Sequence, residues 1–357
     1  MPAIAYYITG HGFGHARRSV EVVRQLIALR PDLTIYFRTT ANPAILEELG
    51  GSNIHLDRVE LDPGAIERDL LTIDHAATIE AVREAIARRD ELVAAEVPFL
   101  RRQNIQFILC DIPFLAGDIA AAAGIPIIGI TNFTWDWIYE PYFTSRGDLL
   151  EEIQNSYRKI PTLLKIRFGG RTDWFKEVIN IPVIASTPKR TSEEIVNILH
   201  LDRGRPRVLI SLRGGISAQT LITAANSSPD YLFFSTVPVP PNSPQNLCCF
   251  PLTQSLTFSD LLSASSVVLS KLGYGIVADC LAARVPILWP RRSGFREDEV
   301  TLAEASPHLA MREIPHADLF AGNWKPHLDQ LLRMPMPRQG LPTNGASVAA
   351  QIISSRL

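Results

Sequence analysis

The sequence predicts an α/β protein of two doubly wound domains, each a parallel sheet covered by helices on both faces. The chain has 357 residues, which exceeds one ordinary α/β domain and suits two of about 150–200 residues. Short apolar runs alternate with helical patterns from the N-terminus onward, as in βαβ units. This alternation stops near residue 132 and restarts near residue 206. The restart favours two similar domains over one extended sheet.

The first half of the chain contains the elements of one such domain. A strand at Ala3–Thr9 precedes a glycine-rich turn, and a helix at Arg17–Leu29 carries apolar residues at helical spacing. The elements that follow are a strand at Leu33–Arg38, a helix at Pro43–Leu49, a long helix at Ile73–Leu100 that starts near Asp74, a strand at Phe107–Cys110, a helix at Phe114–Ala123 and a strand at Ile125–Ile130. This order implies a parallel sheet with right-handed crossovers.

The pattern is interrupted in the middle of the chain. Residues Asn132–Lys176 are aromatic and irregular, and the apolar run Ile181–Ser186 is expected to form a strand. The segment Thr187–Arg205 is the best candidate for a linker. We therefore expect an N-terminal domain of residues 1–190 and a C-terminal domain of residues 200–341.

The second half repeats the strand, glycine-loop and helix order. Strands are expected at Arg207–Ser211, Tyr231–Ser235, Leu247–Phe250, Ser266–Leu269 and Pro286–Trp289. Helices are expected near Ala218–Ala225 and at Phe258–Ser263, Gly275–Ala283 and Ala346–Ser355, the last signalled by Asn344-Gly345.

Composition narrows the class of function and the compartment. The 35 Lys and Arg nearly balance the 37 Asp and Glu, which argues against a nucleic-acid binder. The four cysteines show neither a disulfide framework nor a zinc spacing, so a reducing, cytoplasmic location is expected. The N-terminus lacks a basic leader, and no apolar run approaches the ~20 residues of a membrane helix. Peripheral contact with a membrane stays open.

The sharpest local feature is the loop Gly10–His15 between the first strand and the first helix. Its glycines let the backbone approach a ligand, and the carboxyl end of a strand is where open α/β sheets bind ligands. The spacing G-x-G-x-G differs from the dinucleotide fingerprint, and the second strand ends without an acidic residue, which disfavours a nicotinamide cofactor. Loop histidines are usually only solvated. Here His11 and His15 are candidates for proton abstraction, because imidazole titrates near neutral pH.

Two clusters in the second half are candidate phosphate sites. The turn Arg213-Gly214-Gly215 offers a guanidinium and backbone N–H groups to an anion, or it is simply a tight turn with a solvated arginine. The loop containing Lys271, Gly273, Tyr274 and Gly275 opens a helix, whose N-terminus favours anions. Asp279, one turn into that helix, either binds a ribose diol or only favours the helix dipole. The charged loop from Arg291 to Glu299 is either a solvated face or a set of acceptors for sugar hydroxyls.

Together these residues resemble the GT-B glycosyltransferase superfamily over essentially the whole chain, a fold of two Rossmann-like domains that face a central cleft. The segment from Gly273 to Glu299 is similar to the donor site of the peptidoglycan N-acetylglucosaminyltransferase family. That resemblance implies that Asp279 binds the nucleotide ribose. It also implies that Arg296, Glu297 and Asp298 contact the donor sugar, although family members often have Gln there. His15 falls on the histidine of that family, and the final helix, residues 346–357, is expected to pack back on the N-terminal domain.

A closer resemblance is to the glycosyltransferase-like N-terminal half of plant L-arabinokinases and to stand-alone bacterial relatives. It rests on four matching stretches: Tyr6–Ala16, Leu61–His75, Thr131–Tyr139 and Lys271–Ala282. The phosphate loop of the sugar-kinase half does not occur in this sequence, so kinase activity is not implied.

The resemblance implies transfer of a sugar, inverting and without a metal, from a nucleoside-diphosphate sugar to an acceptor hydroxyl. A UDP-sugar is the expected donor and co-substrate, and no further cofactor is expected. The C-terminal domain would bind the donor diphosphate, and His15 or His11 would remove the acceptor proton. The expected acceptor residues are Gly12, Phe13, Asn132, Trp135 and Asp136. Two alternatives stay open: a nucleotide-sugar-binding module without transfer activity, and a UDP-sugar epimerase on the same fold.

Overall fold

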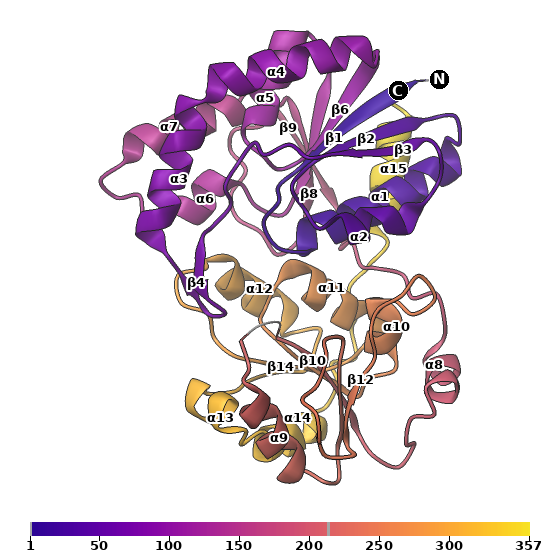
Figure 1. Cartoon of the computed structure of the whole chain (residues 1–357). Coiled ribbons are helices and arrows are strands. Elements are labelled where there is room, and N and C mark those ends of the chain that lie inside the picture. Colours follow the sequence, from indigo (N-terminus) through magenta and orange to yellow (C-terminus); the bar gives the residue numbers. More distant parts are fainter. Residues whose placement is uncertain (1, 213–214) are drawn as a thin grey trace. The chain divides into compact units, whose positions relative to one another are not determined.

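The structure is a computed structural model that describes residues 2–212 and 215–357 (Figure 1). The described residues form two compact units. Unit 1 contains the chain up to Ile66, together with Ile73–Ala185 and Asn344–Leu357. Unit 2 contains Glu67–Thr72 and Ser186–Thr343. The short segment Glu67–Thr72 therefore belongs with the second half of the chain, although the sequence places it in the first domain.

Unit 1 is built on a seven-stranded sheet in the order β3-β2-β1-β6-β7-β8-β9. Its neighbouring strands all run parallel. The strands are β1 (Ala3–Ile8), β2 (Thr34–Arg38), β3 (Ile54–Asp57), β6 (Ile105–Asp111), β7 (Ile127–Thr131), β8 (Thr162–Ile166) and β9 (Glu177–Ile181). The residues of β1 and β7 are buried throughout, as expected of central strands covered on both faces.

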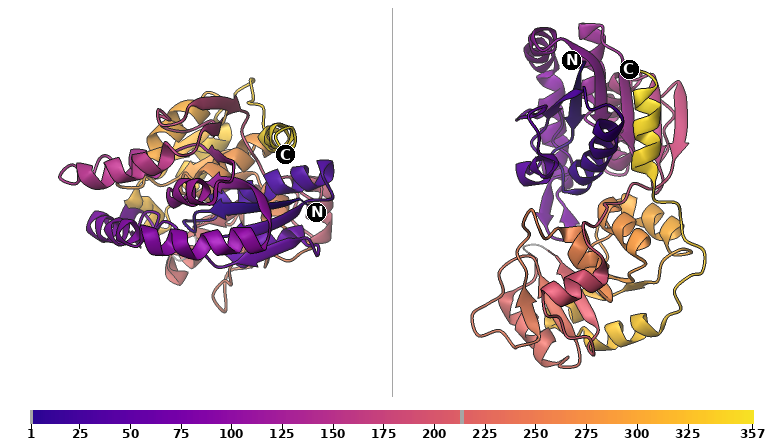
Figure 2. Two further views of the ribbon diagram at one scale, coloured as in Figure 1. Left: turned by 90° about the horizontal axis from the view of Figure 1, so that it is seen from above. Right: turned by 90° about the vertical axis from the view of Figure 1, so that its right-hand side faces the viewer.

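The helices of unit 1 come from both ends of the chain. They are α1 (Gly14–Leu29), α2 (Pro43–Leu46) with the short 3-10 turn η1 (Glu47–Leu49), α3 (His75–Ala87), α4 (Arg89–Arg102), α5 (Leu115–Ala123), α6 (Trp135–Tyr139), α7 (Gly147–Tyr157) and α15 (Gly345–Ser354). The C-terminal helix α15 packs against α1 and β9, and Figure 2 shows it alongside the strands of this unit. The N–H of Gly345 donates to the carbonyl of Val183, which fixes the start of α15 to unit 1.

Unit 2 has a six-stranded parallel sheet in the order β12-β11-β10-β13-β14-β15. The strands are β10 (Arg207–Ser211), β11 (Leu232–Ser235), β12 (Leu247–Cys249), β13 (Val267–Ser270), β14 (Ile287–Trp289) and β15 (Met311–Glu313). The helices are α8 (Ser192–Ile198), α9 (Ala218–Asn226), α10 (Phe258–Ser263), α11 (Tyr274–Ala283), α12 (Glu297–Ala305), α13 (His316–Ala321) and α14 (Lys325–Arg333). The short strands β4 (Glu67–Asp69) and β5 (Thr72–Ile73) pair as a separate two-stranded sheet.

Both sheets reverse their strand order at one point. In unit 1 the reversal lies between β1 and β6, and in unit 2 it lies between β10 and β13. Open α/β sheets bind their ligands outside the carboxyl ends of the strands at such a reversal. We therefore expect a ligand site at each of these two positions.

Several local expectations are wrong. Instead of a strand at Ile181–Ser186, the structure has the edge strand β9, which begins earlier in the sequence, at Glu177, and ends at Ile181. Most residues of β9 are exposed. The linker contains α8, whose first turn is held by a capping box between Thr191 and Glu194. The long helix breaks at Arg88 into α3 and α4, whereas its expected start is right, because Asp74 caps α3 through the N–H of Ala77.

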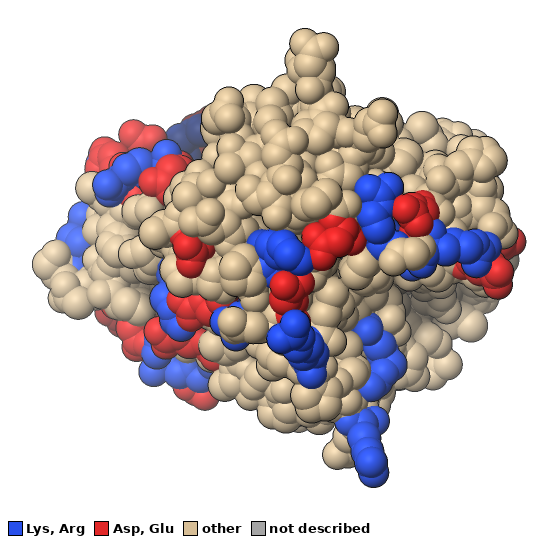
Figure 3. Space-filling model, turned by 90° about the horizontal axis from the view of Figure 1, so that it is seen from below, with Lys and Arg blue, Asp and Glu red and all other residues tan. Residues whose placement is uncertain are grey.

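The surface carries both signs of charge. In Figure 3, Lys and Arg side chains lie interspersed with Asp and Glu on the face shown. Within residues 2–212 and 215–357, no helix combines the length and the apolar character that crossing a bilayer requires.

Candidate functional sites

The site of unit 1 centres on a histidine and an aspartate from adjacent elements. His15 lies in the first turn of α1, and Asp111 is the last residue of β6. The His15 Nδ1 atom lies 2.8 Å from the Asp111 Oδ1 atom, and both side chains are buried. A carboxylate only accepts, so the Asp111 contact favours a proton on Nδ1 and a basic Nε2 atom. A terminal nitrogen of Arg18, which only donates, lies 2.7 Å from the same Nδ1 atom and favours the opposite tautomer. Among the described residues, Nε2 of His15 has no hydrogen-bond partner.

Arg18, one turn further along α1, holds the same carboxylate in place. Its Nε donates to Asp111 Oδ2 at 2.5 Å, and a terminal nitrogen donates to Oδ1 at 2.5 Å. The other terminal nitrogen donates to the side-chain oxygen of Asn132 at 2.7 Å. Asn132 in turn donates to the carbonyl of Phe168. Arg18 thus fixes the Asp111 carboxylate through a bidentate contact, and the fixed carboxylate in turn limits the rotation of the His15 ring.

The pKa values of this cluster suit a neutral base. Burial lowers the pKa of His15 below its usual 6.5, the charge of Arg18 lowers it further, and Asp111 offsets these effects only in part. Burial alone would raise the pKa of Asp111, but Arg18 and His15 outweigh it and the pKa is lowered. At neutral pH the cluster therefore holds a neutral imidazole beside an ionised aspartate.

His11 lies in the same region, against the indole of Trp135 with the ring centroids 5.4 Å apart. Trp135 also lies near His15, at 6.3 Å between centroids, and stacks on Tyr139 at 5.4 Å. Gly12 and Phe13 form the turn between the two histidines, and the Phe13 side chain is exposed. The glycine at position 10 is required by close packing, because a Cβ there would lie 1.9 Å from the side-chain oxygen of Thr40.

A second acid, Asp62, lies next to this loop. Its Oδ1 accepts hydrogen bonds from the hydroxyl of Thr9 at 2.6 Å and from the N–H of Gly64 at 3.0 Å. Gly64 packs directly on His11, since a Cβ at position 64 would lie 2.5 Å from that of His11. Burial raises the pKa of Asp62 to about 7, although the bonds from Thr9 and Gly64 act in the opposite direction.

Asp62 gives folding stability a pH dependence of defined sign. Its folded pKa lies above the unfolded value of 3.8, so its stabilising contribution is complete below that pH and is lost as the pH rises through about 7. Asp62→Asn removes this titration and retains an oxygen for Thr9 and Gly64. We expect its unfolding free energy, relative to the wild type, to rise by up to ~4 kcal/mol from pH 4 to pH 8. Urea unfolding at both pH values measures this, and a constant difference would contradict the buried titration.

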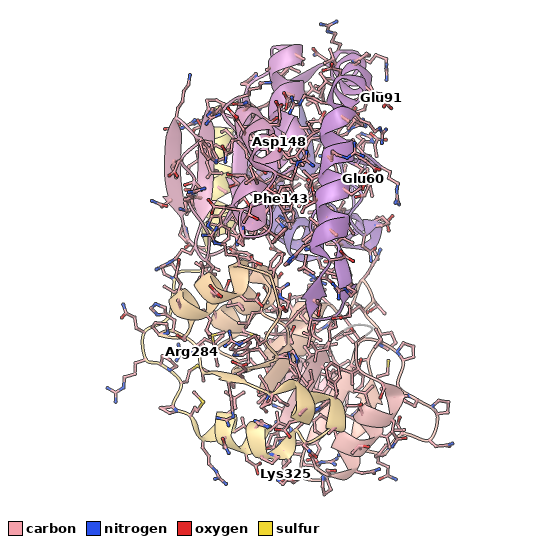
Figure 4. The ribbon with its side chains drawn as sticks, turned by 90° about the vertical axis from the view of Figure 1, so that its left-hand side faces the viewer. Glu60, Glu91, Phe143, Asp148, Arg284 and Lys325 are labelled. Carbon is pink, nitrogen blue, oxygen red and sulfur yellow. The ribbon has the colours of Figure 1, made fainter. Side chains whose placement is uncertain are left out.

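Asp136, expected to contact the acceptor, has a different environment. It lies in the first turn of α6, and its Oδ2 accepts the indole N–H of Trp174 at 2.8 Å. Burial raises the pKa of its carboxyl group. No hydrogen bond between described residues joins it to His15. Phe143, labelled in Figure 4, is buried and stacks on Tyr139 of α6. The other labelled residues of unit 1 are exposed: Glu60, Glu91 and Asp148.

In unit 2, the described members of the expected diphosphate site lie at the carboxyl ends of β10 and β13. Lys271, Gly273, Tyr274 and Gly275 link β13 to α11, and Gly273 caps that helix without a side-chain bond. Gly215 follows β10, whereas Arg213 and Gly214 lie outside the described residues. The ammonium group of Lys271 donates to the carboxylate of Glu67 at 2.7 Å. The loop after β13 and Gly215 after β10 therefore lie at the point where the strand order of unit 2 reverses.

Asp279, the expected ribose ligand, is buried in α11 with a backbone partner. Its Oδ1 accepts the N–H of Ser186 at 2.7 Å, in the segment that begins unit 2. Asp260 accepts the N–H groups of Lys189 and Arg190 in the same way. The two aspartates therefore anchor residues 186–190, a role that the sequence alone does not reveal.

The expected donor-sugar residues lie at the start of a helix rather than in a loop. Arg296 caps α12, and Glu297 and Asp298 occupy its first turn, where acids are favoured by the helix dipole. Asp298 is engaged by the buried Arg292, whose Nε donates to its Oδ2 at 2.9 Å. Arg292 also donates to the carbonyl of Leu272 at 2.6 Å, so it joins the α12 acids to the glycine loop.

Besides Arg18, four residues that belong to these sites have no individual role predicted from the sequence: Asp62, Asp111, Glu67 and Arg292. Asp111 could have been predicted from the sequence, because it directly follows an apolar run, at the end of the sheet where ligands bind. Asp62 and Glu67 depend on the distant partners Thr9 and Lys271, whereas Arg292 lies only six residues from its partner Asp298. From the sequence alone, Arg18 could not be told apart from an arginine on the exposed face of a helix.

Comparisons with known proteins agree with this architecture. No protein-family model matches the chain. The chain is 29% identical over 360 residues to L-arabinokinase from Arabidopsis thaliana, a match that covers 98% of this chain and 34% of that protein. The chain thus spans about a third of the length of this curated relative. The match confirms the resemblance seen in the motifs.

Solved glycosyltransferases share the fold over nearly the whole chain. CalG4, the calicheamicin glycosyltransferase, matches with a TM-score of 0.67 at 14% identity, covering 99% of this chain and 98% of that chain. UGT2 of Phytolacca americana, complexed with UDP-2-fluoro-glucose and pterostilbene, matches with a TM-score of 0.62 at 13% identity, covering 99% and 94%. A putative UDP-N-acetylglucosamine 2-epimerase of Listeria monocytogenes matches with a TM-score of 0.56 at 12% identity, also covering 99% and 94%. At these identities the likeness concerns the fold, and the chain has the GT-B fold of two doubly wound domains.

Proposed function

We propose that the chain is a glycosyltransferase that moves a sugar from a nucleoside-diphosphate sugar, expected to be a UDP-sugar, to an acceptor hydroxyl. The observation that carries this proposal is the buried pair of His15 and Asp111 at the strand-order reversal of unit 1. In this proposal the neutral imidazole donates from Nδ1 to Asp111, so its Nε2 atom is basic and suits removal of a hydroxyl proton. The fold shared with CalG4 and UGT2 supports the same class of reaction.

In this proposal, unit 1 binds the acceptor and unit 2 binds the donor. As the acceptor oxygen forms its bond to the anomeric carbon, Nε2 of His15 takes the hydroxyl proton. The bond between that carbon and the diphosphate oxygen breaks, and UDP leaves with inversion of configuration. Asp111 stabilises the imidazolium that forms, as the aspartate of a catalytic triad does.

The departing diphosphate is stabilised without a metal in this mechanism. Lys271 supplies a positive charge, and the N-terminus of α11 supplies backbone N–H groups that point outward from the helix start. Arg213 and Gly214, outside the described residues, are proposed to contribute from the turn after β10. Phe13, whose side chain is exposed, is proposed to contact the acceptor, because aromatic rings stack on sugar faces and other flat apolar groups. Trp135 is fully buried, so the expectation that it contacts the acceptor is wrong, and its ring packs against His11 and His15 instead.

A release assay tests the proposal against its two rivals. The purified protein is incubated with a panel of UDP-sugars, with and without acceptor extracts, and free UDP is measured. Transfer predicts UDP release that depends on both a UDP-sugar and an acceptor. An epimerase, favoured only by the fold match to the Listeria protein, would convert the donor without needing an acceptor. A binding module would bind UDP-sugars and release nothing.

The ribose role of Asp279 is tested separately from its role in anchoring Ser186. Asp279→Asn keeps an oxygen for the Ser186 N–H and removes the charge. We expect UDP binding to weaken by ~1–3 kcal/mol in a calorimetric titration, the scale of a lost charge-assisted hydrogen bond. The melting temperature should stay close to that of the wild type.

The matched comparison is Asp279→Ala, which leaves the partly buried N–H of Ser186 without the oxygen of Asp279. This variant should also lose ~1–3 kcal/mol of unfolding free energy. Unchanged UDP affinity in Asp279→Asn would leave Asp279 with the anchoring role alone.

A further inference from the structure

The segment Glu67–Thr72 lies over the strand-order reversal of unit 2. It consists of β4 and the start of β5, the small two-stranded sheet labelled at β4 in Figure 1. Its contacts reach three turns in unit 2: Gly215 after β10, Lys271 after β13 and Ser293 after β14. Because β10, β13 and β14 are neighbours in one parallel sheet, these turns share its carboxyl end. The hairpin therefore covers the position where this fold binds its ligand.

Apolar packing and backbone bonds hold the hairpin there. Leu71 is buried and belongs to the hydrophobic core of unit 2. The N–H of Ser293 donates to the carbonyl of Leu71 at 2.7 Å, and Thr72 forms a parallel bridge with Ser293. Leu70 packs so closely on Gly215 that a Cβ at that position would lie 2.1 Å from its Cδ2 atom. These contacts place the hairpin in the site without involving the charge of Glu67.

The carboxylate of Glu67 forms an ion pair with Lys271, the lysine of the glycine loop. Its Oε1 lies 2.7 Å from the Lys271 Nζ atom, and both side chains are partly exposed. A second cation, Arg292, has a buried side chain that is engaged by Asp298. A carboxylate thus occupies the position at Lys271 where an anionic oxygen of a ligand would bind.

We propose that the hairpin Glu67–Thr72 is part of the nucleotide-sugar site of unit 2 and that Glu67 competes with the donor diphosphate for Lys271. This inference rests on the proposed function, since it takes the donor to be a nucleoside diphosphate. In the free chain the carboxylate neutralises Lys271. A diphosphate carries more negative charge than one carboxylate, so it displaces Glu67 and takes the ammonium group.

Glu67→Gln tests the competition, because glutamine removes the charge at nearly constant shape. In calorimetric titrations of the full chain, the variant is expected to bind UDP about two- to fivefold more tightly, since a partly exposed ion pair contributes little. Inorganic pyrophosphate should show the same gain, whereas uridine, which has no phosphate, should show none. The matched control is Glu80→Gln, which removes an exposed ion pair with Arg83 on α3. It should leave all three affinities unchanged.

A double-mutant cycle shows whether Glu67 acts through Lys271. Lys271→Gln should weaken UDP binding, and adding Glu67→Gln to it should bring no further gain. If the wild type binds UDP and Glu67→Gln binds it no more tightly, the competition is wrong while the proposed function stands. If the gain persists without Lys271, the competition is also wrong. If neither protein binds UDP or pyrophosphate, the proposed function and this inference both fail.

Discussion

Replacing His15 with alanine is expected to lower the turnover of sugar transfer by ~10²–10⁴-fold, the usual contribution of a general base. With the ring proton on Nδ1, which lies 2.8 Å from Asp111, Nε2 is the atom that takes the acceptor proton. UDP affinity should barely change, because the donor residues belong to unit 2. Steady-state turnover measured beside a UDP titration separates these two effects.

The pH profile of turnover provides a second readout for His15. Burial, followed by the charge of Arg18, lowers its pKa below 6.5, so the imidazole stays unprotonated to a lower pH than a free histidine would. The acid limb of turnover should therefore fall below pH 6.5 and disappear from the residual activity of His15→Ala.

His11→Ala is the matched control for His15→Ala. It removes the other loop histidine, which packs on Trp135. Loss of turnover in His11→Ala with near-normal turnover in His15→Ala would show that the wrong histidine is assigned. If neither variant is impaired, the proton goes elsewhere, with Asp136 as the next residue to replace.

Asp111→Asn is expected to lower both turnover and stability. Turnover should fall on the order of 10²–10⁴-fold, because the amide cannot stabilise the imidazolium of His15 or fix its tautomer. The unfolding free energy should fall by ~3–5 kcal/mol, because Arg18 is left as a buried charge without its counter-ion. Urea unfolding and steady-state kinetics measure the two losses.

A double variant separates the two roles of Asp111. Arg18→Met combined with Asp111→Asn removes the buried guanidinium together with the carboxylate, so much of the lost stability should return. Turnover should remain low, since His15 still lacks its carboxylate. If turnover recovers together with stability, Asp111 acts only as a structural partner of Arg18.

The sequence was sufficient to predict the two doubly wound domains. Each central strand is a short apolar run bounded by a glycine loop or a polar turn, and such runs have few alternatives in a parallel sheet. The strand at Arg207–Ser211 and the helix at Phe258–Ser263 were predicted with their observed bounds. The start of α3 was also readable, since an aspartate before a helix accepts a backbone N–H.

The elements that were missed depend on tertiary contacts. The edge strand β9 is mostly exposed, and its backbone bonds to β8, rather than an apolar pattern, hold it in the sheet. The acids of the first turn of α12 were predicted to lie in a loop, although acids are common in the first turn of a helix. Helix α7 and strand β8 lie in the segment whose aromatic residues suggested irregular structure.

For each candidate site, the sequence predicted only one residue of the interacting pair. The histidine loop and the glycine loop at Lys271 stand out in the sequence, because each follows a strand and opens a helix. Their partners do not: Asp111 lies 96 residues from His15, and Glu67 lies 204 residues from Lys271. No spacing rule joins residues so far apart, since the strand order of the fold brings them together.

The fate of the donor sugar is the most direct test of glycosyl transfer. A pool of UDP-sugars carrying ¹³C at the anomeric carbon is incubated with the protein and acceptor extracts, and the labelled carbon is followed by NMR. Transfer predicts a new anomeric signal of a glycoside, formed together with free UDP and lost in His15→Ala. A label that stays on UDP, whether unchanged or in an epimerised sugar, would contradict a glycosyltransferase.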